Sequence, residues 1–233
     1  MTDTKKHILV VVARRYNGHE LWTALGTYKQ RGHTFEVIST GNVLQDEITM
    51  RANRIKRTID DVDPSEMESK FDALMIVSGN MTDTEKYWQH PRVLEYVRVA
   101  ESLGKPIAAI CCSVPTIRDA AFEKKVSYFP LVRSRELLVR AGAILQTTAL
   151  TRHKNLVTAE HQMASQVWAE EFCNLLEGKP QEHIFTDSGF VPHGGEMMPN
   201  PHVEALRIKM GRPPTVIRKP KEPNGHSTEQ HLD

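Results

Sequence analysis

Short apolar runs alternate with amphipathic segments from residue 7 to residue 178, and this alternation constrains the fold more than any other feature. The runs are continuous, rich in branched residues and only a few residues long, which is typical of strands buried on both faces. Strands that alternate with helices predict a mostly parallel, doubly wound α/β sheet with helices on both faces. The five clearest strand segments are "HILVVVA" (7–13), "TFEVIST" (34–40), "FDALMIVSGN" (71–80), "KPIAAIC" (105–111) and "NLVTA" (155–159).

The segments between these strands carry helical signals. In residues 18–32, Leu21, Leu25 and Tyr28 recur at helical spacing, and Gly32 is a reasonable helix stop. Further helices are predicted over 63–68, 90–104, 115–125, 134–142 and 161–178, with one more short strand in "AILQ". Residues 41–63 lack clear periodicity and are predicted to form short edge strands or a surface loop. The basic strip "RANRIKR" (51–57) within them is either a solvated loop or a contact for an anionic substrate or partner.

The composition changes after Gly178, so we predict an α/β domain over residues 1–178 and an extended arm over 179–233. The start of the arm holds apolar residues that a solvated tail does not need, whereas the sequence beyond about Lys219 suits disorder. The histidines of "PHGGEMMPNPH" lack tight ligand spacing. We therefore expect structural or incidental roles for these histidines, and no metal.

The charge and cysteine content of the chain limit the kinds of partner and cellular setting that we expect. The chain has 30 Lys+Arg and 29 Asp+Glu, so it offers no broad basic field for nucleic acid. Three cysteines, two of them adjacent, make no disulfide framework and favour a reducing, cytoplasmic setting. The apolar run after "MTDTKK" is too short to span a membrane and has no signal-peptide cleavage pattern. We expect a small-molecule substrate, with no nucleic-acid or membrane partner.

Polar and reactive residues follow the predicted strands at "RRYNGHE", "SGNMTD", "CCS" and "EH", where doubly wound sheets form their sites. Cys111 ends a buried strand just before a predicted helix. If Cys111 is a nucleophile on a tight turn, the helix N-terminus would lower the pKa of its thiol. If it only ends the strand, it is buried filler. The spacing alone leaves both interpretations open, while Cys173 within "EEFCNLL" is predicted to be core.

The stretch "KPIAAICCSVPTI" resembles the "AAICHGP" or "AAICAGP" turn of the ThiJ/PfpI superfamily, and the resemblance extends over residues 5–178. "VDPSEMESKFDALMIVSGN" is similar to the segment "NPEEFDALVIPGG" of that superfamily. The resemblance implies a flavodoxin-like fold of the class I glutamine-amidotransferase type. It also implies that Cys111 is the nucleophile and that Glu20, before the first helix, contacts it.

Several positions depart from the pattern of the superfamily. The usual Pro-Gly-Gly reads Val77-Ser78-Gly79, and we expect the backbone of Gly79, with Ser78 and Asn80, to help form an oxyanion hole. Peptidase-type members carry histidine directly after the nucleophile, where this chain has Cys112, and other members have a histidine near the position of Phe129.

Two other histidines are candidates for the missing base. His161 follows the last strand, as the catalytic histidine does in class I amidotransferases, although it could equally be a surface or capping residue. His19 lies next to Glu20 and is a candidate contact for substrate. Cys112 is either packing, a polar neighbour of the nucleophile or a resolving thiol.

Two functions remain open at this point. The first is a cysteine-dependent hydrolase or lyase without a cofactor, in which Cys111 attacks a small amide, aldehyde, imine or isonitrile. The second is a redox sensor or stress protein that oxidises at Cys111 without turnover. A third, weaker possibility is a scaffold that assembles through its arm. The superfamily often forms dimers, so we expect a homo-oligomer.

Overall fold

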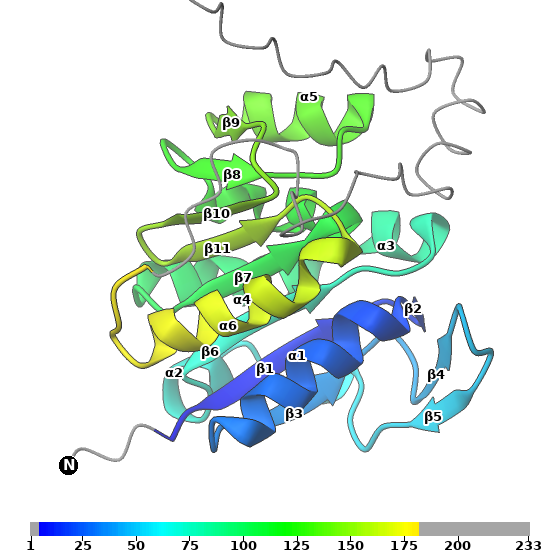
Figure 1. Cartoon of the computed structure of the whole chain (residues 1–233). Helices are drawn as coiled ribbons and strands as arrows, with labels where there is room; N and C mark the ends of the chain where they lie inside the picture. Colours follow the sequence, from blue (N-terminus) through cyan, green and yellow to red (C-terminus); the bar gives the residue numbers. More distant parts are fainter. Residues whose placement is uncertain (1–4, 182–233) are drawn as a thin grey trace, which may run out of the picture. The chain divides into compact units, whose positions relative to one another are not determined.

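The computed structural model describes residues 5–181 and is built on a six-stranded sheet (Figure 1). The order of its strands is β10-β11-β7-β6-β1-β3, and every neighbouring pair is parallel except β10 and β11. The predicted mostly parallel sheet is therefore confirmed. The strands are β1 (His7–Val12), β3 (Thr34–Ile38), β6 (Ala73–Val77), β7 (Ile107–Ile110), β10 (Leu150–His153) and β11 (Leu156–Ala159).

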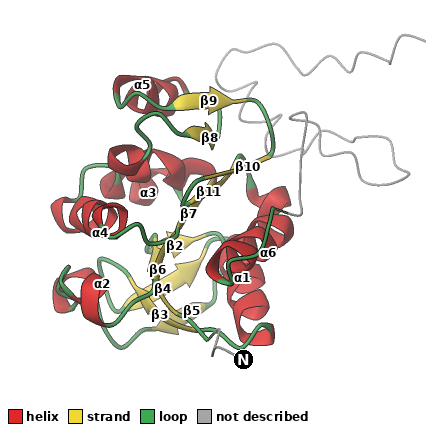
Figure 2. Ribbon diagram, turned by 90° about the vertical axis from the view of Figure 1, so that its left-hand side faces the viewer, coloured by secondary structure: helices red, strands yellow, loops and turns green. Residues whose placement is uncertain are grey.

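Helices cover both faces of this sheet (Figure 2). Helices α1 (Gly18–Gln30) and α6 (Ser165–Leu176) lie on one face, and α2 (Glu66–Ser69) and α4 (Pro91–Ser102) lie on the other. In β1, Leu9 and Val11 belong to the core under α4, whereas Val10 and Val12 belong to the core under α1 and α6. Because both sides of each central strand are buried, the strands read as unbroken apolar runs.

Two small sheets flank the main one. The first joins β2 (Arg15–Tyr16), β4 (Val43–Asp46) and β5 (Ala52–Arg54) in the order β2-β4-β5. The second pairs β8 (Lys125–Ser127) with β9 (Ile144–Gln146). The remaining helices are α3 (Met81–Tyr87), α5 (Val132–Arg140) and the 3₁₀ segments η1 (Ile59–Asp61), η2 (Cys111–Ala120) and η3 (Gln162–Ala164).

The helix predicted over 115–125 is wrong in its position and type. The chain instead forms η2, a 3₁₀ helix that begins at Cys111 itself, with a kink at Ile117. Pro115 lies inside this segment and lacks an N–H, so it interrupts the hydrogen bonds that a regular α-helix would form here. The structure also contains α3 and β10, which the sequence did not predict.

The last helix ends at Leu176, close to the predicted end of the domain. The arm expected from residue 179 lies outside the described residues except for its first three positions. Within the described range 5–181, no helix is long and apolar enough to cross a membrane.

The register of the central strands brings their carboxyl ends to one edge. Val12 pairs with Val77 across β1 and β6, and Ile110 pairs with Ala159 across β7 and β11. The segments that follow these four strands are those expected to carry the chemistry. They meet at a single edge of the sheet, as parallel strand order requires.

Candidate active site

Cys111 lies on a sharp turn between β7 and η2. Its φ angle is +57°, in the left-handed region that non-glycine residues seldom adopt. The buried hydroxyl of Ser113 secures this turn: its oxygen accepts the Ile110 N–H at 3.1 Å and lies 2.9 Å from the carbonyl oxygen of Ile76. Ser113 thus ties the turn to both β6 and β7, and Cys111 is held in a strained conformation at the end of its strand.

Glu20 lies in the first turn of α1, fully buried. Asn17 caps this helix through Oδ1, which accepts the N–H groups of His19 and Glu20 at 3.1 and 3.3 Å. The loop after β6 supplies the partners of the carboxyl group, because Ser78 donates both its N–H (3.1 Å) and its hydroxyl (2.7 Å) to Oε2. The other oxygen, Oε1, is buried and has no hydrogen-bond partner among the described residues.

The surroundings of Glu20 favour its neutral form. Burial is the main cause that raises its pKa well above the usual range, and the nearby sulfur of Cys111 raises it further. Hydrogen bonds from Ser78 act in the opposite direction but do not cancel these effects. Because Oε2 already accepts two hydrogen bonds, Oε1 is the oxygen available to carry the proton. A neutral carboxyl group can then donate a hydrogen bond, which a carboxylate cannot.

Cys111 and Cys112 place their sulfur atoms 3.7 Å apart. The hydrogen bond between the two thiols is the main cause that raises the pKa of Cys111, and burial is the second. The Cys112 N–H and the Ser78 hydroxyl lower it, although by less. The expectation of a lowered pKa for Cys111 is therefore wrong, although the backbone N–H at the start of η2 acts in the expected direction. The neighbouring thiol, which the sequence shows but does not orient, outweighs the backbone donors.

An apolar wall surrounds the two thiols. Trp88 is fully buried, and its Nε1 donates to the carbonyl oxygen of Cys112 at 2.8 Å. Met81, Phe129 and Leu131 pack in the same cluster. Phe129 stands near where other members of the superfamily carry a histidine, so this part of the site contributes apolar contacts instead of a titratable group.

The loop after β6 lies against β2. A Cβ atom at position 79 would come within 1.9 Å of the carbonyl oxygen of Arg15, so only glycine fits there. The Gly79 N–H donates to Thr84 Oγ1 at 3.1 Å, and the Asn80 N–H donates to the Arg15 carbonyl oxygen at 2.7 Å. Both backbone donors already have partners. An oxyanion role for Gly79 would require its N–H to leave Thr84, and it stays a prediction.

His161 lies at the same edge of the sheet, one strand away from Cys111. Its Nδ1 accepts the Met163 N–H at 3.1 Å and caps η3, while burial lowers the pKa of the ring. The ring is therefore neutral with its proton on Nε2. His19 is exposed. The structure brings Glu20, Ser78, Cys111 and Cys112 together, and the base role of His161 and the substrate contact of His19 stay predictions.

Comparison with known proteins identifies the family. The family model described as "DJ-1/PfpI family" matches residues 6–175. The chain belongs to the DJ-1/PfpI family. An uncharacterized protein of Methanocaldococcus jannaschii is 25% identical over 176 residues, which cover 74% of this chain and 82% of that protein.

Solved structures share the DJ-1/PfpI fold with this chain. A ThiJ/PfpI domain protein from Brachyspira murdochii has a TM-score of 0.66 at 19% identity and covers 76% of this chain and 99% of its own. DJ-1beta of Drosophila melanogaster has a TM-score of 0.62 at 21% identity, with coverages of 75% and 92%. Oxidized DJ-1 of Toxoplasma gondii has a TM-score of 0.63 at 17% identity, with coverages of 76% and 93%. These likenesses concern the fold.

The sequence did not predict three residues that hold this DJ-1/PfpI site in place, namely Asn17, Trp88 and Ser113. Asn directly before a helical pattern is a capping signal that could have revealed Asn17. A serine two positions after the cysteine could have suggested Ser113, whereas no local pattern could connect Trp88 with Cys112. Among residues 5–181, no group of three or more His, Cys, Asp or Glu side chains could hold a metal ion.

Proposed function

We propose that this DJ-1/PfpI member is a cysteine-dependent enzyme in which Cys111 attacks a small electrophile in hydrolase or lyase chemistry. The observation that carries the proposal is the connection from the strained turn to a buried acid. The Ser78 hydroxyl lies beside the Cys111 sulfur and donates to Glu20 Oε2 at 2.7 Å. A nucleophile, a hydroxyl and a carboxyl in this order form the kind of arrangement that covalent catalysis needs.

Proton transfer can proceed through these groups. The Cys111 sulfur forms a bond to the carbonyl carbon while the π electrons of the C=O bond move to oxygen. The thiol proton passes to the Ser78 oxygen, whose own proton passes to Glu20 Oε2. In the same step Oε1 gives its proton to the substrate oxygen, so Glu20 never holds two protons, and the covalent intermediate is a hemithioacetal when the substrate is an aldehyde.

Among the candidate electrophiles, aldehydes suit this site better than amides. Cleavage of an amide requires a group that protonates the departing nitrogen, whereas addition to an aldehyde expels no group. Burial keeps His161 neutral and its Nδ1 is engaged by a backbone N–H, so it offers a poor general acid. Addition of the thiol to an imine or an isonitrile also expels no group, so these substrates rank with aldehydes, and amides come last.

The alternative is a cysteine redox sensor without turnover. A second thiol 3.7 Å from Cys111 favours this function, because it could resolve an oxidised sulfur. The fold is also similar to that of a DJ-1 protein in an oxidized form. Against it, the raised pKa of Cys111 lowers the thiolate fraction on which oxidation depends, whereas in the proposed enzyme the thiol proton leaves through Ser78 as the bond to the substrate forms.

The enzyme is tested by following the conversion of glyoxal, whose adduct can transfer hydrogen from the attacked carbon to its neighbour and then be released by water as glycolate, with acetamide and an alkyl isonitrile as comparison substrates. Acetaldehyde and benzaldehyde, which can form only the adduct, are controls without turnover. Cys111→Ser should reduce turnover to background, because the nucleophile is lost. Cys112→Ser should retain turnover, and Cys173→Ser is a matched control at a buried free thiol in α6. Full turnover by Cys111→Ser would contradict the proposal.

Mild peroxide treatment followed by mass spectrometry separates the two functions. Selective sulfenic or sulfinic acid at Cys111, together with no turnover of any substrate, would favour the sensor. Light scattering at micromolar concentration tests the expected homo-oligomer, and a monomer would contradict it.

A further inference from the structure

A cavity of about 480 Å³ lies against the small sheet β2-β4-β5, and Cys111 is not among its lining residues. This volume is in the range of sites for small organic ligands. Its lining residues are Arg14, Arg15, Val43, Gln45, Ala52 and Asp83.

The register of the small sheet explains how this lining forms. Arg15 pairs with Gln45 across β2 and β4, and Gln45 pairs with Ala52 across β4 and β5. Directly paired residues project to the same face of a sheet, and so does Val43, two positions before Gln45. The small side chain of Ala52 leaves room above this face. The lining of the cavity is therefore partly apolar, and both of its arginines come from the start of β2 and the residue before it.

The charges around the cavity leave an excess of positive charge. Asp83 is the one acidic group in the lining, and both of its oxygens are engaged: Arg15 Nε lies 2.9 Å from Oδ2, and Lys86 Nζ lies 2.9 Å from Oδ1. Arg14 is exposed, and its guanidinium has no hydrogen-bond or ion-pair partner among residues 5–181. Arg15 uses Nε on Asp83 and Nη2 on Asn80 (3.1 Å), which leaves Nη1 for a further acceptor.

We propose that this cavity binds a small organic anion. Its carboxylate or phosphate group would accept hydrogen bonds from Arg14 and from Nη1 of Arg15, and its body would lie on Val43 and Ala52. Guanidinium groups are the donors that match the planar fork of a carboxylate and the oxygens of a phosphate. The basic strip over residues 51–57 adds Arg54, which pairs with Val43, to the positive surroundings.

The cavity shares a wall with the loop that carries Ser78. The Arg15 carbonyl oxygen accepts the Asn80 N–H at 2.7 Å, and Tyr16 pairs with Gly79. A ligand bound to the Arg15 side chain therefore lies next to that loop, because Arg15 Nη2 donates to Asn80 Oδ1. The binding does not depend on the chemistry of Cys111, so it can be measured without a turnover assay.

Isothermal titration calorimetry with benzoate, phenyl phosphate and benzamide tests the proposal. Benzamide has nearly the shape of benzoate without its charge, and the two anions distinguish carboxylate from phosphate as the preferred group. Benzoate or phenyl phosphate should bind at millimolar concentration or below, and benzamide at least tenfold more weakly. Arg14→Gln should weaken anion binding by about tenfold or more, because a hydrogen bond to a charged group is lost.

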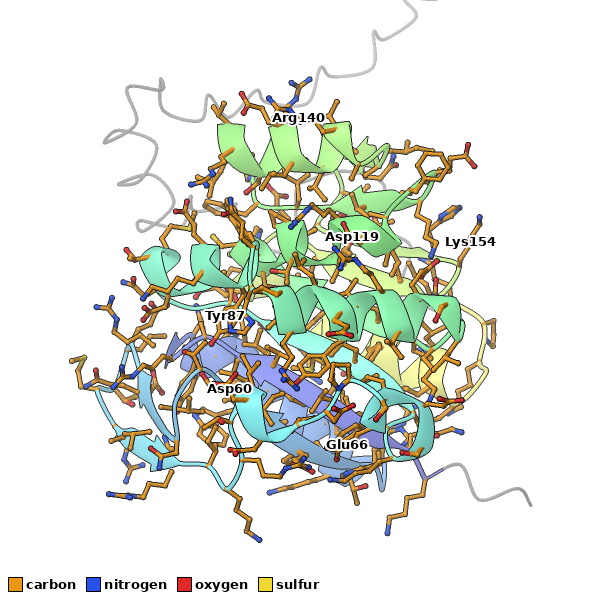
Figure 3. The ribbon with its side chains drawn as sticks, turned by 180° about the vertical axis from the view of Figure 1, so that it is seen from behind. Asp60, Glu66, Tyr87, Asp119, Arg140 and Lys154 are labelled. Atoms are coloured by element: carbon orange, nitrogen blue, oxygen red, sulfur yellow. The ribbon has the colours of Figure 1, made fainter. Side chains whose placement is uncertain are left out.

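Two further variants complete the test. Ala52→Leu changes no charge but fills the cavity, so it should also abolish binding. Arg140→Gln is the matched control, since Arg140 is an exposed arginine on α5, away from the small sheet (Figure 3), and it should bind like the native chain. Absence of anion binding at 10 mM, equal binding of benzamide and benzoate, or unchanged affinity in both Arg14→Gln and Ala52→Leu would overturn the proposal.

Discussion

The two ends of the central sheet differ in whether their buried polar groups have hydrogen-bond partners. At the amino-terminal end, Lys105 precedes β7, and its Nζ donates to the Phe71 carbonyl oxygen at 2.6 Å. Asn155 directly precedes β11, and Lys124 Nζ lies 2.7 Å from its Oδ1 and 2.5 Å from Glu101 Oε1. These ammonium groups are matched by acceptors on neighbouring segments, as buried charges require.

At the carboxyl-terminal end, the chain retains groups that ordinary packing would avoid. Glu20 is fully buried with one oxygen unpartnered among the described residues, and Cys111 adopts a left-handed backbone conformation. Such features cost stability and persist where the surrounding structure enforces them. The amino-terminal end thus matches its charges with acceptors, whereas the carboxyl-terminal end keeps a strained turn and a carboxyl oxygen that is unpartnered within the described part of the chain, features that cluster at functional sites.

The largest effect is expected for Glu20→Gln, which keeps the acceptor for Ser78 but cannot transfer a proton. Turnover should fall by about 100-fold, as for loss of a general acid–base group. The raised pKa means that folded Glu20 stays protonated while the unfolded chain ionises above pH ~4.5. The native chain therefore loses stability as pH rises from there toward the folded pKa, and glutamine does not.

Urea unfolding of both proteins between pH 5 and pH 8 measures this difference. The free energy of unfolding of the variant, relative to that of the native chain, should rise by up to about 1.4 kcal/mol per pH unit within that window. If the free energies of unfolding of the two proteins instead change in parallel with pH, Glu20 is ionised in the folded protein. The carboxyl-terminal end would then not differ from the amino-terminal end in holding an uncharged buried acid.

A smaller effect is expected at the other end for Lys105→Met, which keeps the length of the side chain. The variant removes the donor to the carbonyl oxygens of Met67, Glu68 and Phe71, so it should lower the free energy of unfolding by about 2 kcal/mol. Lys56→Met is a matched control at an exposed lysine and should change stability by less than about 0.5 kcal/mol. Equal effects of the two variants in urea unfolding would argue against the stabilising role of the amino-terminal end.

The smallest effect concerns the strain at Cys111. Glycine tolerates its φ of +57°, so Cys111→Gly should be more stable than Cys111→Ala by about 1 kcal/mol. At an ordinary helical position the order would be reversed, so the sign alone is informative. Thermal unfolding of the two variants, compared with the native chain, gives the answer. A less stable glycine variant would mean that the turn is not strained.

The sheet could be predicted because strands that are buried on both faces have unbroken apolar sequences, as in β1 and β6. Helix α3 could not, because its buried positions include Asp83 and Thr84 as well as Tyr87, and these give no apolar periodicity. Asp83 is stabilised there by Arg15, which is distant in sequence. Contacts of this kind become visible only once the fold is known.

The candidate site shows the same limit. The turn at Cys111 and the position of Glu20 followed from a resemblance in the residues around them. The state of the thiol did not, because it depends on how the Cys112 side chain is oriented and on a 3.7 Å sulfur contact. The engagement of the Gly79 N–H by Thr84 is likewise a matter of geometry that no motif records.

The contact between Trp88 and the Cys112 carbonyl oxygen gives this site an optical signal of its own. The indole is fully buried and packs in one cluster with both thiols, so its fluorescence should respond to an adduct or an oxidised sulfur at Cys111. Of the two other tryptophans, Trp168 belongs to α6 and is buried in the core below this helix, and Trp22 is half exposed on α1. With these two replaced by phenylalanine, the fluorescence of the protein would report changes at Cys111 in real time and without any added dye.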